Sequence, residues 1–153
     1  MMYIHDCTKW KSILFVINIL DKQEEKFFEQ FREECLKFNP KMVMNAGLWN
    51  REKKITKSKD YQRRPNEWNP TDFNWWGQHK NKGIEDFFFR NYDALFVFAE
   101  GFETKCLPIL KASNAQLKVG FDDALDNFEV LLKPAQPDFR GKVEVVKQYF
   151  LKR

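Results

Sequence analysis

Glycine is scarce in this sequence, and the motifs that depend on glycine are missing. The 153 residues include six glycines, and their spacing matches neither the GxGxxG turn of dinucleotide-binding proteins nor the GxxxxGK[ST] loop that holds phosphates. The GxSxG elbow that presents a catalytic serine is absent too. These absences exclude a nicotinamide site, a P-loop and a serine-hydrolase elbow as far as motifs can exclude them, and we expect no cofactor.

Cysteine and histidine are also few. The three cysteines, Cys7, Cys35 and Cys106, are an odd number and form no CxxC pair, so neither a disulfide framework nor a zinc knuckle is predicted. Two histidines, His5 and His79, are too few for a histidine-rich metal site. We therefore expect reduced thiols, no metal ion and a cytoplasmic location.

A long hydrophobic run is missing as well. The apolar run from Ser12 to Leu20 follows Lys9 and Lys11, as the apolar part of a signal peptide would. The charged stretch from Asp21 to Lys26 comes next, where a signal peptide would have its small-residue cleavage site. The run is also too short to cross a bilayer. We interpret it as a buried strand and expect no membrane span.

Apolar runs and helical periodicity alternate along the chain. Hydrophobic residues make up 43% of the sequence and include sixteen phenylalanines, which indicates a packed core. Runs typical of strands occupy Ser12 to Asn18, Met42 to Trp49, Ala94 to Ala99, Gln116 to Phe121 and Phe128 to Leu132. Helical spacing covers residues 22–38, 81–90 and 104–113, and Asp138 caps a final helix whose core face is Phe139, Val143, Val146 and Phe150.

This alternation predicts the fold class. Strands followed by helices form right-handed βαβ units in a parallel sheet. We expect one α/β domain over residues 1–153, a three-layer sandwich of Rossmann-like or flavodoxin-like type. Its sheet is expected to hold four to six mostly parallel strands.

Positive charge and tryptophan are concentrated in one segment, residues 49–82, which we call the basic segment. It contains four of the five tryptophans. The stretch from Arg51 to Arg64 contains seven lysines and arginines and two acidic residues, so its net charge is +5, while the net charge of the whole chain is +4. The rest of the chain is therefore close to neutral.

The basic segment is the first candidate for a contact surface. Lysine and arginine neutralise phosphates, and tryptophan is enriched among residues that anchor protein partners or stack on bases. The alternatives are that the charges are an ordinary solvated connection and that at least one ring of the Trp75–Trp76 pair packs on the sheet. The candidate residues are Trp49, Lys53, Lys54, Arg63, Arg64, Trp68, Trp75, Trp76 and Lys80.

The carboxyl ends of the strands are the second candidate, because ligands of parallel sheets bind there. Asn18, His79, Glu100 and Asp122 are expected to line such a pocket. Asn18 stands where a metal-dependent phosphotransferase usually has an acidic residue, so the neighbouring acids are interpreted as turn residues and caps. This pocket would suit a small enzyme, or the remnant of one, that binds a phosphorylated or sugar ligand.

Several motifs resemble an uncharacterised family of small proteins from Bacteroidota. The most specific is Asp72-Phe73-Asn74-Trp75-Trp76-Gly77 with Lys80. The family order is also matched by a first strand at Lys11 to Ile17, a strand led by Tyr92-Asp93, the Ser-x-Ala-x-x-x-Val-Gly element from Ser113 to Gly120, and Asn127 to Val130. Trp76 departs from the phenylalanine often found there, and the stretch from Arg51 to Arg64 is unusually basic. The resemblance implies a fold and no activity.

A second, weaker similarity is to the N-terminal half of heptosyltransferase-like glycosyltransferases. It is carried by Tyr92 to Phe98 followed by Ala112 to Phe121. Those enzymes need a second Rossmann-like half to hold the sugar nucleotide, and this chain is too short to contain one.

The leading hypothesis is a non-enzymatic binding or adaptor module. Its partner is expected to be a protein or a ribonucleoprotein, and nucleic acid stays open as a direct ligand. The sequence does not indicate an oligomeric state.

Overall fold

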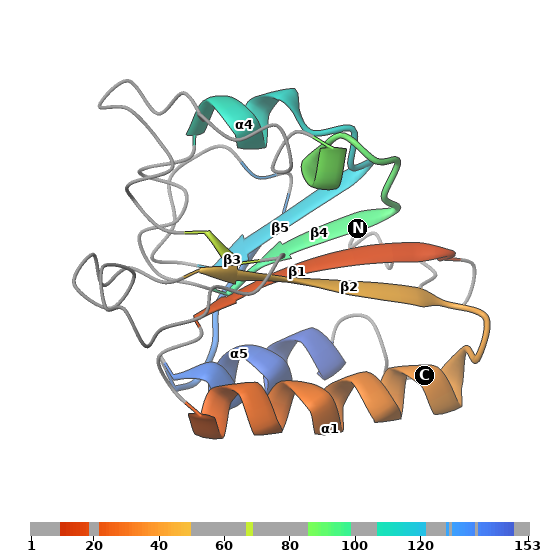
Figure 1. Cartoon of the computed structure of the whole chain (residues 1–153). Helices are drawn as coiled ribbons and strands as arrows, with labels where there is room; N and C mark the ends of the chain where they lie inside the picture. Colours follow the sequence, from red (N-terminus) through yellow and green to blue (C-terminus); the bar gives the residue numbers. More distant parts are fainter. Residues whose placement is uncertain are drawn as a thin grey trace, which may run out of the picture.

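Strands and helices alternate along the chain. The computed structural model describes residues 10–18, 22–49, 67–68, 86–98, 107–121, 128, 130–136 and 138–148. The strands are β1 (Ser12–Asn18), β2 (Val43–Trp49), β3 (Glu67–Trp68), β4 (Ala94–Val97), β5 (Leu117–Phe121) and β6 (Val130–Leu132). The helices are α1 (Lys22–Phe38), α4 (Leu107–Ala112) and α5 (Phe139–Val146), and residues 86–88 are also helical. Figure 1 shows one sheet between two helical layers, so the predicted α/β class is confirmed.

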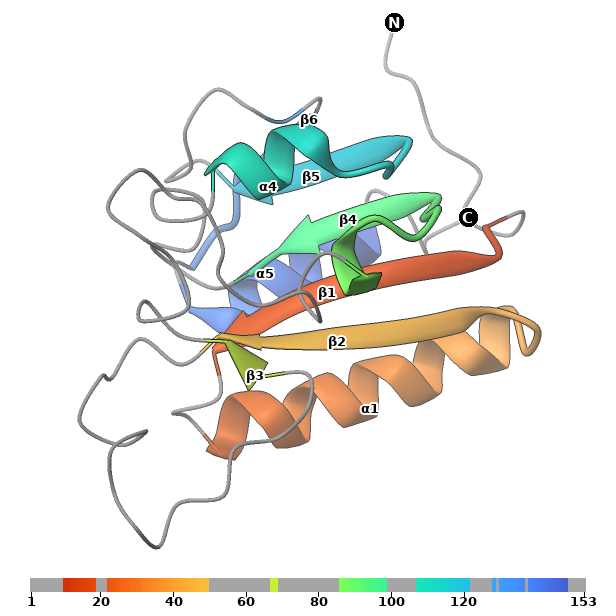
Figure 2. The same ribbon diagram turned by 45° about the horizontal axis from the view of Figure 1, so that its top comes forward.

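The six strands form one sheet in the order β3-β2-β1-β4-β5-β6, and each pair of neighbours is parallel (Figure 2). This is the doubly wound Rossmann order 3-2-1-4-5-6. Without the two-residue β3, the order is that of flavodoxin, 2-1-3-4-5. Both predicted types therefore share the five longer strands, and β3 decides for the Rossmann order.

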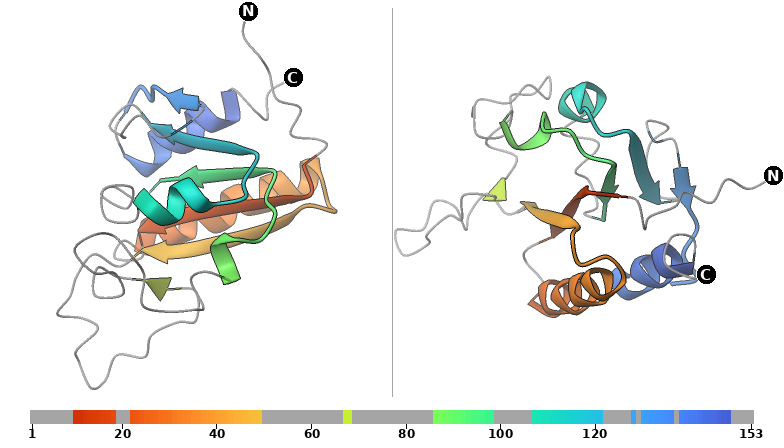
Figure 3. Two further views of the ribbon diagram at one scale, coloured as in Figure 1. Left: turned by 90° about the horizontal axis from the view of Figure 1, so that it is seen from above. Right: turned by 90° about the vertical axis from the view of Figure 1, so that its right-hand side faces the viewer.

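Strand β1 divides the core in two. Ile13, Phe15 and Ile17 belong to the cluster that α1 and α5 cover, whereas Leu14 and Val16 belong to the cluster covered by α4 and residues 86–88. Figure 3 shows α1 and α5 side by side under one face and α4 over the other. Successive strand residues point to opposite faces, so a central strand covered on both sides is apolar throughout.

Phe15 lies at the centre of the larger cluster. The centroid of its ring is 5.3 Å from that of Phe28 and 5.7 Å from that of Phe31, both on α1. It also stacks on Phe96 of β4 at 5.2 Å and on Phe98 at 5.8 Å. These edge-to-face and offset arrangements are those that aromatic rings prefer, so one side chain joins β1, β4 and α1.

We predict that Phe15→Ala lowers the free energy of unfolding by about 3–5 kcal/mol, the usual loss for truncating a buried phenylalanine. The control is Val43→Ala on β2, where the side chain is 55% exposed and the loss is expected to stay within about 0.5 kcal/mol. Urea unfolding of both variants measures the difference. Equal losses in the two variants would contradict the central place of Phe15.

Asp93 ties the amino ends of β1 and β4 together. One oxygen of its carboxylate, Oδ2, accepts hydrogen bonds from the backbone N–H of Lys11 at 2.6 Å and of Ser12 at 3.1 Å. The backbone N–H of Asp93 in turn donates to the carbonyl of Ser12 at 2.8 Å. Charge-assisted bonds of this kind are stronger than neutral ones, so Asp93 fixes the alignment of β1 against β4.

Tyr92 fastens the helical residues 86–88 to the sheet. Its hydroxyl donates to the carbonyl of Phe87 at 2.8 Å and accepts from the side-chain amide of Asn45 on β2 at 3.4 Å. Burial raises the pKa of the Tyr92 phenol above its ordinary value of 10.0, although the hydrogen bond from Asn45 and the charge of Arg90 oppose the shift. The neutral phenol is therefore the form that the folded state favours.

A raised pKa gives a stabilisation that is complete below the ordinary phenol value and is lost as pH rises through the folded-state value. We therefore expect the wild type to be more stable than Tyr92→Phe near neutral pH, and the difference to shrink above pH 10.0. Urea unfolding of both proteins between about pH 8 and about pH 11 measures this, because the range brackets the ordinary phenol value. The other tyrosines are present in both proteins and cancel; two parallel curves would rule the effect out.

Two predicted motifs have a local explanation. In the Ser-x-Ala-x-x-x-Val-Gly element, the Ser113 hydroxyl accepts from the Ala115 N–H at 3.2 Å, and a Cβ at Gly120 would lie 2.8 Å from the ring of Phe128. At α5 the predicted cap is confirmed, since Asp138 Oδ1 accepts from the Gly141 N–H at 2.8 Å. Glycine is needed at position 120 because the Phe128 ring packs directly on the backbone.

The sequence missed β3 and placed some ends differently. It predicted strands to Ala99 and from Phe128, whereas β4 ends at Val97 and β6 begins at Val130. Residues 81–85, Thr104 and Phe150, which the predicted helices include, lie outside the described residues. In the part of the chain that the structure describes, no helix has the length and apolar character to cross a membrane.

Candidate functional site at the carboxyl edge of the sheet

All six strands end at one edge of the sheet, because they are parallel. Asn18 of β1 lies opposite Trp49 of β2, and Trp49 lies opposite Trp68 of β3. On the other side of β1, the chain continues past the end of β4 to Phe98, whose N–H donates to the Val16 carbonyl at 2.8 Å. The strand order reverses between β1 and β4, and the crevice at such a point is where open α/β sheets bind ligands.

Trp49 is buried, with 2% of its surface exposed, and it belongs to the core cluster on the α4 face. The prediction that its ring contacts a partner is therefore wrong: an apolar ring at the end of a core strand gains more by packing under the second helical layer. Trp49 instead holds the start of the basic segment against the sheet.

The structure brings two of the other predicted residues to this edge by their backbone. Asn18 ends β1 and Trp68 ends β3, so the two flank the end of β2. The remaining predicted residues lie outside the described part of the chain, and their candidacy stays a prediction: Lys53, Lys54, Arg63, Arg64, Trp75, Trp76, His79, Lys80, Glu100 and Asp122.

The pairing of β2 with β3 fixes both ends of the most basic stretch. The chain leaves β2 at Trp49 and is again beside it at Glu67 and Trp68, with Glu67 opposite Leu48 and Trp68 opposite Trp49. The residues between, 50–66, contain the stretch with a net charge of +5. The charge therefore belongs to a closed connection that starts and finishes at the carboxyl edge.

Glu67 is a buried carboxylate at this edge that sequence reasoning missed. Its residue is 1% exposed. A charged group is rarely buried unless hydrogen bonds or opposite charges compensate for the lost water. The signal in the sequence is slight, because Glu67 and Trp68 stand between Pro65 and Pro70 without an apolar run around them.

Lys142 of α5 is the second buried charge, with 5% of its surface exposed. Its ammonium donates to the carbonyl of Phe98 at 2.9 Å and lies 5.1 Å from the centre of the Phe121 ring. Phe98 follows β4 and Phe121 ends β5, so Lys142 connects α5 to the carboxyl ends of two strands. The helical spacing predicts a core face of Phe139, Val143, Val146 and Phe150, and it does not predict the burial of this lysine.

Clusters typical of metal sites are not seen at this edge: the described ranges hold no group of three or more His, Cys, Asp or Glu placed to bind an ion. The buried charged residues described there are Glu67 and Lys142, one of each sign.

The chain was compared with known protein families, curated proteins and solved structures. A family model matches residues 4–151. The chain belongs to a family of unknown function, DUF6913. The match covers nearly the whole chain, as expected for the resemblance to an uncharacterised family. No curated protein and no solved structure matches.

In this DUF6913 member we predict that Lys142→Met lowers the free energy of unfolding by about 1–3 kcal/mol, the usual cost of removing one partner of a buried polar contact. Methionine keeps most of the aliphatic volume, so the loss reports on the ammonium. The control is Lys147→Met on the same helix, whose ammonium lies 2.7 Å from Glu34 in a more exposed ion pair. There we expect a loss of about 1 kcal/mol or less.

Urea unfolding of both variants makes the comparison. A Lys142→Met protein as stable as the wild type would mean that this contact contributes nothing to the carboxyl edge. A larger loss in Lys147→Met than in Lys142→Met would count equally against it.

Proposed function

We propose that the protein is a non-enzymatic binding module, an adaptor that contacts a protein or ribonucleoprotein partner through the basic segment. Charge comes from Lys53, Lys54, Arg63, Arg64 and Lys80, and aromatic contact from Trp68, Trp75 and Trp76. Trp49 is left out of the contact surface because it is buried.

The observation that supports this proposal is the pairing of β3 with β2. Both ends of the most basic stretch are paired at the carboxyl edge, and seven lysines and arginines lie between these ends in the sequence. Confined charge of one sign raises the local potential and speeds encounter with an oppositely charged partner. The same charge spread along the chain would not have this effect.

The residue types of the segment favour an anionic partner that also offers aromatic rings or bases for stacking. Lysine and arginine neutralise phosphates, and release of counterions from the nucleic acid makes that binding depend on salt. Tryptophan contributes about 1–3 kcal/mol per stacked base and is also common at protein hot spots. A ribonucleoprotein offers both kinds of contact.

The test is a charge reversal, Lys53, Lys54, Arg63 and Arg64 to Glu, in one variant. We expect it to abolish co-purification of the partner from the native host at low salt, because each reversal replaces attraction by repulsion. Mass spectrometry and the 260/280 nm absorbance ratio, with and without RNase, identify what is lost. Partners retained in full by this variant would refute the proposal.

The matched control reverses four lysines outside the segment, Lys26, Lys37, Lys41 and Lys133, which are all exposed. Both variants change the net charge equally. If the control loses the same partners, the interaction depends on total charge and not on the basic segment.

A second candidate function follows from the strand order. The strand order reverses between β1 and β4, and doubly wound proteins bind small ligands at such a point. A small enzyme, or a remnant related to one half of a glycosyltransferase, would place a phosphorylated or sugar ligand there, beside Asn18 and near His79, Glu100 and Asp122. This function requires saturable binding of a small molecule in the absence of any macromolecular partner, which the adaptor does not.

A further inference from the structure

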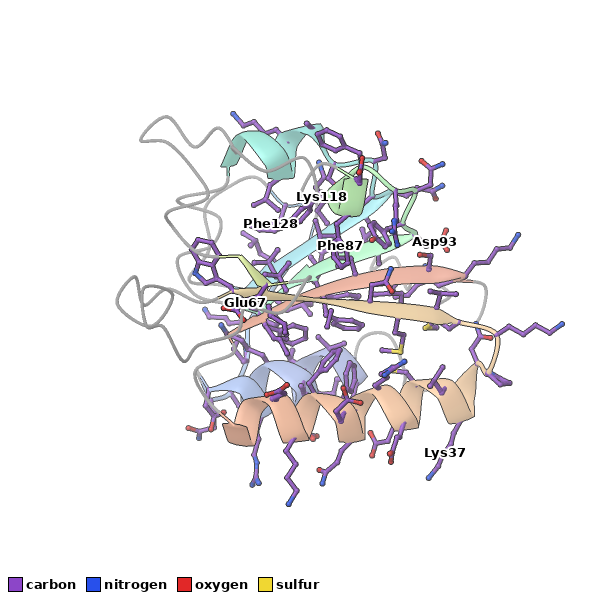
Figure 4. The ribbon with its side chains drawn as sticks, in the orientation of Figure 1. Lys37, Glu67, Phe87, Asp93, Lys118 and Phe128 are labelled. Atoms are coloured by element: carbon purple, nitrogen blue, oxygen red, sulfur yellow. The ribbon has the colours of Figure 1, made fainter. Side chains whose placement is uncertain are left out.

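Glu67 is buried, and its burial plays no part in the proposed function. It is a negative residue inside the basic segment, and it is buried rather than exposed to solvent. Figure 4 shows Glu67 beside β2 at the edge where the strands end, with Asp93 at the opposite edge. One acidic residue is thus placed at the point where the chain returns to the sheet.

A buried carboxylate needs partners that replace its lost hydration. Glu67 takes part in hydrogen bonding or other electrostatic interaction. Among the described residues, no buried side-chain nitrogen or oxygen is without a hydrogen-bond partner. A buried carboxylate whose oxygens are satisfied resists displacement, because moving it without its partners leaves charge and lone pairs uncompensated.

The backbone alone holds β3 weakly. In the described part of the chain, two residue pairs, Leu48 with Glu67 and Trp49 with Trp68, connect β3 to the sheet, and β3 has β2 as its one neighbouring strand. Such short pairings open easily, since opening exposes few buried apolar contacts. A side chain that is fixed at this position therefore has a large share in keeping β3 closed.

We propose that Glu67 is a positioning residue whose buried carboxylate fastens the basic segment to the carboxyl edge of the sheet. The inference rests on the proposed function of the segment, because fastening matters for binding only if the segment is the contact surface. The fastening itself is measured independently of any partner.

The first experiment is limited trypsin digestion of Glu67→Gln, with cleavage after the lysines and arginines between Arg51 and Arg64 quantified by mass spectrometry. Glutamine keeps the shape and loses the charge. Cleavage of a transiently open state follows its population when closing is fast. We expect cleavage within the segment to rise about tenfold, which corresponds to about 1.4 kcal/mol.

The matched control is Glu34→Gln on α1. It removes the same charge from an exposed ion pair with Lys147, far from Glu67 in the sequence. We expect its cleavage pattern to equal that of the wild type. Cleavage after Lys37 and Lys118 in every variant monitors global unfolding. Should Glu67→Gln unfold globally, Glu67→Asp keeps the charge with a shorter reach, and its cleavage is expected between those of the wild type and the glutamine variant.

The second experiment measures binding of a fluorescent oligouridine of about 20 nucleotides, longer than common single-strand site sizes. Removing one negative charge strengthens non-specific attraction to RNA, so Glu34→Gln is expected to bind equally or more tightly. Glu67→Gln is expected to bind about tenfold more weakly despite the same change of charge, a difference of about 1.4 kcal/mol.

The outcomes separate the two proposals. Unchanged cleavage within the segment in Glu67→Gln overturns the inference, even where the fourfold charge reversal abolishes partner binding and supports the adaptor. Increased cleavage supports the fastening, even where the wild type does not bind oligouridine and the partner is a protein.

Discussion

The fold depends on a central strand that is buried on both faces. β1 pairs with β2 on one side and β4 on the other, so it sets the position of every other strand directly or through one of these two. Its residues must fill two cores at once, and the ring of Phe15 contacts aromatic rings from both α1 and β4. A polar residue anywhere in Ile13–Ile17 would be left without water, which explains why this run is apolar at each position.

The two edges of the sheet are built differently. At the amino edge, short hydrogen bonds close the structure: Asp93 accepts from Lys11 and Ser12, and the Asn39 side chain donates to the Trp10 carbonyl at 2.9 Å. At the carboxyl edge the described polar anchors are buried charges, Glu67 on β3 and Lys142 on α5. The amino edge thus aligns the strands, and the carboxyl edge is the one at which doubly wound sheets usually bind ligands.

The fold was predictable wherever many residues share one pattern. The continuous run in β1 expresses burial of both faces of a strand, and the recurrence of Phe28, Phe31 and Cys35 on α1 expresses burial of one face of a helix. The structure confirms both patterns. β3 was not predictable, because two paired residues have no period. The burial of Lys142 was not predictable for a related reason. Its contact with the Phe98 carbonyl depends on where β4 ends in space, and the spacing of residues along a helix carries no information on that position. The prediction that Trp49 lies on a contact surface was wrong for a different reason: tryptophan suits an interface and a core equally well, so its residue type does not decide between them.

Burying the charges of Glu67 and Lys142 at the carboxyl edge is unfavourable in free energy. Removing an ion from water is unfavourable, and hydrophobic residues of similar volume often stabilise a protein as well or better. What a buried, satisfied charge provides in return is a defined geometry, because its partners tolerate little displacement. Like charges in a stretch with a net charge of +5 repel one another. Two buried residues, Trp49 and Glu67, stand at the two ends of the connection that contains this stretch.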